Sequence, residues 1–155
     1  KMSDYLVFST SWNEDDVDFL ESILKELNHE KTKTIIMSSS PTFHWTNVFT
    51  VLDKFVLQNY KLPSPEQTKQ LEEKLFTQIP NSVFERNKRL KKISKENGLT
   101  YLDKFKYTCD LNKKRCKILT DQYKKIYYDL GHYTLDGSFY FARLFKNLGW
   151  SELFK

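Results

Sequence analysis

The segment YYDLGHYTLDG, residues 127–137, holds two side chains whose types and spacing could do chemistry, Asp129 and His132. Two residues separate them, so the carboxylate can accept the Nδ1 hydrogen of the imidazole, fix its tautomer and stabilise the imidazolium. The Nε2 atom can then take a proton from a serine hydroxyl and return it to a leaving group. Such a pair suits acyl transfer through a seryl ester, but taken alone it is a weak signal, because an isolated histidine is more often structural than catalytic.

The residues around this pair suit a loop that leads into a helix. Gly131 is expected to permit an unusual backbone angle beside the histidine. Thr134 is a good N-cap for a helix that begins near Leu135. The apolar face of that helix is expected to contain Phe139, Ala142, Leu144 and Phe145.

The rest of the chain alternates short apolar runs with helical patterns. Strands are expected at residues 4–10, 33–38 and 100–105. Helices are expected at residues 13–27, at 48–57, from Ser64 and Pro65 to Pro80, and from there to Gly98. A small hairpin is expected around TDQY, between Cys109 and Asp129. This order predicts a single α/β domain over residues 1–155, with a mostly parallel sheet and helices on both faces.

The formal net charge is +5, and its densest run is RNKRLKKISK, residues 86–95. A nucleic acid or an anionic membrane surface could attract such a run. Within it, however, Leu90 and Ile93 follow Val83 at helical spacing. This pattern favours a charged surface helix with one buried stripe over a binding patch, so no nucleic-acid partner is predicted.

Cys109 and Cys116 enclose six residues, a spacing that a disulfide can close across a short turn. A bridge would place the chain in an oxidising compartment, and two free cytosolic thiols are the alternative. The nearest histidine, His132, stands alone in the sequence, so no metal site is predicted. No run approaches the roughly 18 apolar residues of a membrane span, and the first residues turn acidic too early for a secretory signal.

Asp-x-x-His followed by Thr-x-x-Gly, at the start of the final helix, resembles the last block of the SGNH hydrolase family. Earlier segments look like the later part of the SGNH domains that are fused to integral-membrane O-acyltransferases. They are YLVFSTSW, TIIMSSSPTF, YLDKF, CDLNKKRC and KKIYYDLGH. The resemblance runs over nearly the whole chain and is most specific in the final block.

The resemblance implies a three-layer, flavodoxin-like fold with a serine nucleophile on a Gly-Asp-Ser turn after the first strand. No Gly-Asp-Ser occurs in this sequence, and none of its four glycines lies at a strand-to-helix turn in the N-terminal half. The first strand here therefore corresponds best to the third strand of the family. The N-terminal strands, the nucleophile and the first oxyanion block are expected upstream of Lys1.

In this branch of the family the strand end at Trp12 borders the active site. Trp12 and Asn13 are therefore candidates for a wall or oxyanion role, with core packing as the alternative for Trp12. His44 is a candidate for substrate contact, with a surface position as the alternative.

Several serines lie at predicted strand ends, where α/β active sites form, and could replace the missing nucleophile: Ser9, Ser11 and Ser38 to Ser40. Helix capping and loop hydrogen bonding are the commoner roles of such serines.

The resemblance implies an O-acyltransferase or esterase domain that needs no cofactor. Its partners would be an acyl donor, a hydroxyl-bearing acceptor such as a glycan or lipid, and a fused or associated membrane acyltransferase domain. Its location would be extracytoplasmic or lumenal, held at a membrane through a parent protein. The alternative is a non-catalytic domain of degenerate esterase fold that binds glycans or anionic surfaces.

Overall fold

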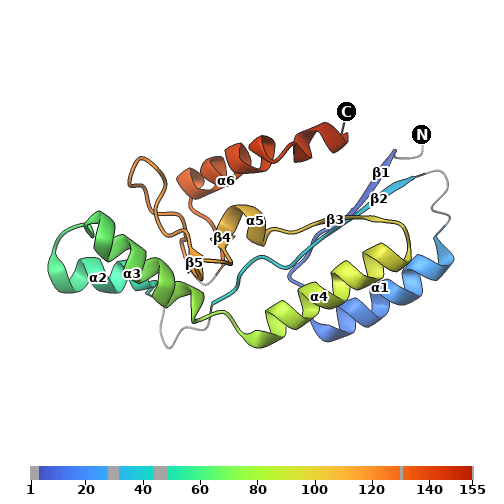
Figure 1. Ribbon diagram of the computed structural model, residues 1–155, viewed down its shortest axis with the longest axis horizontal. Coiled ribbons are helices and arrows are strands. Elements are labelled where there is room, and N and C mark those ends of the chain that lie inside the picture. Colours follow the sequence, from blue (N-terminus) through green and yellow to red (C-terminus); the bar gives the residue numbers. More distant parts are fainter. Residues whose placement is uncertain (1–3, 28–31, 44–48, 130, 155) are drawn as a thin grey trace. The chain divides into compact units, whose positions relative to one another are not determined.

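The computed structural model describes residues 4–27, 32–43, 49–129 and 131–154. The chain forms two compact units, each built from two stretches of sequence: residues 1–40 with 81–104 in unit 1, and residues 41–80 with 105–155 in unit 2. Figure 1 shows the order of the helices and strands along the chain. None of the helices in the described part of the chain has both the length and the hydrophobicity needed to cross a bilayer.

Unit 1 contains a parallel sheet. Its strands are β1 (Tyr5–Phe8), β2 (Lys33–Met37) and β3 (Thr100–Leu102). Their spatial order is β1-β2-β3, so that Ile36 pairs with Phe8 on one side and with Tyr101 on the other. Parallel neighbours require crossover connections, and helices lie in both crossovers of this sheet. The α/β class, with a parallel sheet flanked by helices, is therefore confirmed.

Helices α1 (Glu14–Glu26) and α4 (Asn81–Glu96) lie side by side on one face of this sheet (Figure 1). Their apolar stripes meet the central strand in a cluster of residues that are at most 5% exposed: Trp12, Val17, Leu20, Leu24, Ile36, Leu90 and Ile93. Burial of each large apolar side chain contributes about 1.5–3 kcal/mol, so this cluster stabilises the packing of the two helices on the sheet. The buried stripe predicted for the basic helix is confirmed.

Capping side chains determine where several helices begin. At the start of α1, the Asn13 side chain accepts a hydrogen bond from the Asp16 N–H at 2.8 Å, and the Asp16 carboxylate accepts one from the Asn13 N–H at 2.9 Å. The same reciprocal bonds start α2 (Val51–Asn59) at Thr50 and α3 (Pro65–Phe76) at Ser64. Such pairs satisfy backbone N–H groups that have no partner within the helix.

Unit 2 is mainly helical and contains a short disulfide-linked hairpin. Its remaining helices are α5 (Phe105–Thr108), α6 (Leu135–Asn147) and a 3₁₀ helix at Trp150–Phe154. Strand β4 (Cys109–Asp110) pairs in antiparallel fashion with β5 (Arg115–Cys116). A disulfide joins Cys109 to Cys116, as predicted. Arg115 also donates to the Glu73 carboxylate of α3 at 2.6 and 2.9 Å, which fastens the hairpin to that helix.

The predicted apolar face of the last helix is partly wrong. Helix α6 buries Gly137, Tyr140 and Phe141, whereas Phe139 is 65% exposed and Ala142 is also exposed. The buried positions follow the helical period of three or four residues, and the predicted set combined two sides of the helix.

The predicted strands and hairpin are also shorter than expected, and β1 already ends at Phe8. The hairpin around TDQY is reduced to a single bridge between Leu119 and Lys125, and the two-stranded pairing falls at the cysteines instead. Strand β3 ends at Leu102, because Phe105 already belongs to α5.

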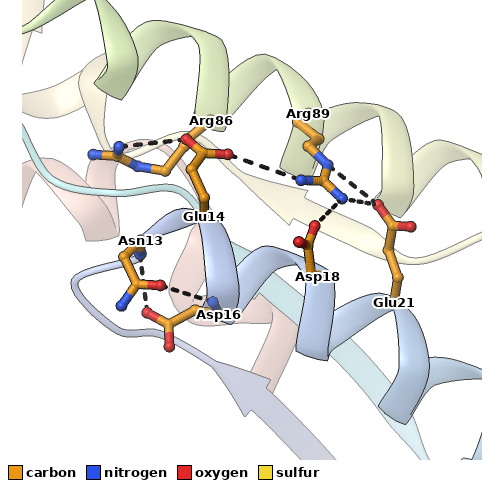
Figure 2. Close-up of polar contacts among 7 residues, drawn as sticks. All are labelled: Asn13, Glu14, Asp16, Asp18, Glu21, Arg86 and Arg89. Carbon is orange, nitrogen blue, oxygen red and sulfur yellow. Dashed lines mark hydrogen bonds and ion pairs between the residues drawn. The ribbon is translucent and has the colours of Figure 1, made fainter.

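The basic helix α4 faces the acidic start of α1 (Figure 2). Arg89 Nη2 lies 2.5 Å from an Asp18 oxygen and 2.8 Å from a Glu21 oxygen, and Nη1 lies 3.8 Å from Glu14. Arg86 lies 3.6 Å from the other Glu14 oxygen. Hydrogen bonds to Glu21 and Asp18 raise the pKa of the Arg89 guanidinium. Part of the basic run is therefore used to join two helices of the same unit.

We expect Arg89→Met to lower the free energy of unfolding by about 0.5–1 kcal/mol, because solvent screens these partly exposed ion pairs. The difference from the wild type should shrink in about 1 M NaCl. Urea denaturation at low and high salt measures both effects.

Lys92→Met is the matched control, since Lys92 lies 3.7 Å from Glu96 of its own helix. Its effect should stay below about 0.5 kcal/mol. Equal losses in the two variants would show that Arg89 does not join the helices.

Candidate active site

The loop that carries Asp129 and His132 is closed at its base by backbone hydrogen bonding. Tyr127 and Tyr133 form an antiparallel bridge. The Tyr128 N–H donates to the His132 carbonyl at 2.8 Å. Tyr127 is 3% exposed and its ring packs edge-on against Phe43, with centroids 5.1 Å apart. The loop therefore projects from a packed aromatic base.

Asp129 and His132 face each other across this loop. Nδ1 of the imidazole lies 2.9 Å from both carboxylate oxygens of Asp129. The same carboxylate accepts hydrogen bonds from the backbone N–H groups of Gly131 at 3.2 Å and His132 at 3.0 Å. A carboxylate beside Nδ1 favours the imidazole tautomer that is protonated at Nδ1. The lone pair of Nε2 is then available to accept a proton.

The surroundings keep the carboxylate charged and the imidazole accessible. Desolvation alone would raise the pKa of Asp129, but the hydrogen bonds from His132 and Gly131 hold it below its ordinary value. The His132 side chain is 85% exposed and the Asp129 side chain 33% exposed. The ring is therefore oriented by an anion on one edge and open to a reacting group on the other.

Gly137 sets how closely α6 approaches the strand-like segment before the loop. A Cβ at this position would lie 2.9 Å from the Ile126 Cα and would also overlap the Ile126 carbonyl. The cap of α6 is next to it, where the Thr134 hydroxyl accepts from the Gly137 N–H at 3.0 Å and donates to the Lys125 carbonyl. The Thr134 N–H also donates to the Ile126 carbonyl at 2.8 Å. Thr-x-x-Gly thus fixes the exit of the loop that holds His132.

Packing does not require a glycine at position 131, because a Cβ there would meet Thr42 Cγ2 at 3.7 Å, an ordinary contact. The backbone angle expected at Gly131 depends on residue 130, which lies outside the described residues, and it stays a prediction. The contribution of Gly131 to the loop is its backbone N–H, which donates a hydrogen bond to the Asp129 carboxylate.

An ion pair ties the other side of the loop to α2. Lys125 Nζ donates to the two Asp53 oxygens at 2.7 and 2.8 Å and lies 3.4 Å from the Tyr128 carbonyl. Burial would raise the pKa of Asp53, but hydrogen bonds from Lys125 and Thr50 lower it below its ordinary value. Sequence spacing gave no sign of this pair, because 72 positions separate the two residues.

A family model described as the SGNH domain (fused to AT3 domains) matches residues 2–147. The chain belongs to this SGNH domain family. The resemblance noted in the sequence is therefore confirmed, and the final block with Asp129, His132, Thr134 and Gly137 lies within the matched residues.

The fold of this SGNH domain is similar to a solved structure, the periplasmic domain of a lipopolysaccharide acetyltransferase from Salmonella ser. Paratyphi A. The TM-score is 0.63 and the sequence identity 15%. The match covers 97% of this chain and 56% of that one, so this chain spans little more than half of the solved domain. Comparison with curated proteins finds no match.

The structure places the other predicted site residues of the SGNH domain as follows. Trp12 is 5% exposed in the core of unit 1, and its indole N–H donates to the Met37 carbonyl at 2.8 Å, which favours the packing alternative. Asn13 caps α1 through its side-chain oxygen. His44 lies outside the described residues. The site roles of Trp12, Asn13 and His44 stay predictions.

The serines at the strand ends have different environments. Ser38 and Ser39 are at most 4% exposed, and the Ser38 hydroxyl donates to the Ser39 carbonyl at 3.0 Å. Ser9 and Ser11 are exposed. The Ser9 hydroxyl oxygen lies 3.0 Å from Lys104 Nζ. Among the described residues, no three His, Cys, Asp or Glu side chains gather as metal ligands would.

We expect Gly137→Ala to lower the free energy of unfolding by about 2–3 kcal/mol, because the added methyl must displace α6 from Ile126. Gly131→Ala is the matched control in the same loop and should cost less than about 1 kcal/mol, since its Cβ has room. Thermal or urea unfolding measures both. Equal costs would mean that α6 does not rely on close approach at Gly137.

We expect Lys125→Met to lower the free energy of unfolding at pH 7 by about 1–2 kcal/mol, after allowance for screening. The pKa of Asp53 is lower in the folded than in the unfolded chain, where it is about 4. The charged carboxylate therefore stabilises the folded state at pH values above about 4, and this stabilisation is lost as the pH falls through the folded pKa. The difference between variant and wild type should therefore shrink toward pH 3, about one unit below the unfolded pKa.

Lys124→Met is the control, because Lys124 is the exposed neighbour of Lys125. Urea denaturation at several pH values gives the result. A deficit in Lys125→Met that does not change with pH would contradict an origin in the Asp53 carboxylate.

Proposed function

We propose that residues 1–155 act as one partial SGNH-type domain that supplies the Asp–His part of a catalytic triad to a serine O-acyltransferase or esterase. The observation that carries the proposal is the contact of His132 Nδ1 with both Asp129 oxygens at 2.9 Å, in an exposed loop. Such a pair is suited to a general base whose orientation and charge are set by the carboxylate.

The nucleophile in this proposal is a serine on a Gly-Asp-Ser turn carried by a segment outside these residues. The proposal is supported by the absence of that triplet from the sequence and by the 56% coverage of the similar solved domain. A base without nucleophile and oxyanion donors gives little rate enhancement, so the complete site needs the remaining segment.

The proposed reaction has two steps through a seryl ester. His132 Nε2 takes the serine proton as the serine oxygen attacks the acyl carbonyl carbon, and the imidazolium gives that proton to the departing group. In the second step His132 removes a proton from an acceptor hydroxyl, which takes the acyl group and restores the serine. Asp129 stabilises the imidazolium in both steps.

The proposed acceptor is a glycan or lipid hydroxyl outside the cytoplasm, with a membrane acyltransferase domain of the same protein as the source of acyl groups. The fusion in the description of the family supports the membrane partner. The lipopolysaccharide acetyltransferase named for the similar structure supports the acceptor class. The disulfide suits an oxidising compartment.

We expect His132→Gln and Asp129→Asn, made in the protein expressed from its complete gene, each to lower kcat for acyl transfer by about 1,000-fold or more. A fluorophosphonate probe should label the Gly-Asp-Ser serine in the wild type and much more slowly in both variants. Peptide-level mass spectrometry identifies the labelled residue.

Asp136→Asn is the matched control, because Asp136 is an exposed carboxylate in the first turn of α6. It should keep wild-type turnover. Near-normal turnover in folded His132→Gln protein would rule out the proposed base.

A further inference from the structure

Ser9 and Lys104 meet at the carboxyl end of the sheet in unit 1. Ser9 directly follows β1, and Lys104 lies shortly after β3. Lys104 Nζ is 3.0 Å from the Ser9 hydroxyl oxygen, although 95 positions separate the residues. The carboxyl ends of parallel strands are where α/β proteins commonly place reacting groups.

The two side chains have environments suited to different roles. Ser9 is exposed, so a reagent can reach its hydroxyl. Lys104 is only 9% exposed, and burial lowers the pKa of its ammonium below the ordinary lysine value. A larger fraction of the Lys104 side chain is therefore neutral than for an ordinary lysine, and a neutral amine can accept a proton from a hydroxyl.

The backbone that carries Lys104 is fixed by buried hydrogen bonds. Its N–H donates to the Ser38 hydroxyl at 2.8 Å, and the Ser38 N–H donates to the Leu102 carbonyl at 2.9 Å. Ser38 is fully buried. These bonds tie the end of β3 to the end of β2, so the base is positioned by the sheet itself rather than by a free loop.

We propose that Ser9 and Lys104 form a serine–lysine dyad, in which Ser9 is a nucleophile toward small acyl esters and works separately from the Asp129–His132 pair. The observation that carries it is an exposed hydroxyl held 3.0 Å from a buried amine at the sheet edge.

The reaction uses only groups of the dyad, the ester and water. The neutral Lys104 amine takes the Ser9 proton while the oxygen attacks the ester carbonyl carbon. The bond to the alkoxide group then breaks, Lys104 returns the proton to that oxygen, and Ser9 is left as an acyl ester. Hydrolysis repeats the sequence with water as the attacking group and the Ser9 oxygen as the leaving group.

The test uses the protein expressed from its complete gene and a fluorophosphonate probe, with the modified peptide identified by mass spectrometry. Counting label only on the peptide that contains Ser9 keeps the result separate from any serine that His132 activates. We expect label on Ser9, none at this position in Ser9→Ala, and a labelling rate about 100-fold lower in Lys104→Arg, whose guanidinium stays protonated.

Two controls match these variants. Ser11→Ala removes the other exposed serine of the same strand end, and Lys106→Arg changes an exposed lysine two positions after Lys104. Both should label at the wild-type rate.

A second readout separates proton transfer from a structural role. In Lys104→Ala, millimolar ethylamine should restore part of the labelling rate, because the amine can occupy the space left by the side chain. Absence of label on the peptide that contains Ser9, or Lys104→Arg protein in which this peptide is labelled as fast as in the wild type, would overturn the dyad. Absence of rescue by ethylamine in folded Lys104→Ala protein would overturn it as well.

Discussion

The candidate site depends on the hydrogen bonds that the Asp129 carboxylate accepts. It accepts hydrogen bonds from two backbone N–H groups and faces Nδ1 of His132 with both oxygens. The backbone bonds fold the loop around the carboxylate, and the side-chain contact sets the plane of the ring. The same anion therefore builds the loop and orients the imidazole, so that geometry and chemistry at this position cannot be varied independently.

The wider structure holds that loop at both ends. Its exit is set by Thr134 and by the absence of a side chain at Gly137, which brings α6 against Ile126. Its entry is set by Lys125, which is bonded to Asp53 at the start of α2. Asp129, His132, Thr134 and Gly137 thus form one local arrangement. Asp129 and Thr134 accept hydrogen bonds from backbone N–H groups of this segment, and Gly137 leaves room for the backbone of Ile126.

This locality explains how much could be predicted from the sequence. The Asp129–His132 contact, the caps at Ser64 and Thr134 and the disulfide all join residues that are close in the chain, and the residue types alone indicate them. Helical periodicity likewise located the buried stripe of α4. It failed for Phe139 of α6, because a helix with apolar residues on two sides does not indicate which side meets the rest of the protein.

Contacts between distant segments could not be predicted, since they depend on which elements become neighbours. Arg89 and Glu21 are 68 positions apart, and Ser9 and Lys104 are 95 apart. The basic run predicted a charged surface helix, but its ion pairs with the acidic residues of α1 could be identified only in the structure. The sequence likewise does not distinguish Lys104 from the other lysines, although in the structure it is buried beside a serine.

The Cys109–Cys116 bridge links the folding equilibrium of this chain to the redox potential of its surroundings. The bridge closes a ring of a few residues, and the chain entropy that such a ring removes from the unfolded ensemble corresponds to about 2.5 kcal/mol. Folded domains are stable by only about 5–15 kcal/mol. Thiol reductants and oxidants should therefore shift the folded fraction of this chain as effectively as a change of several degrees in temperature.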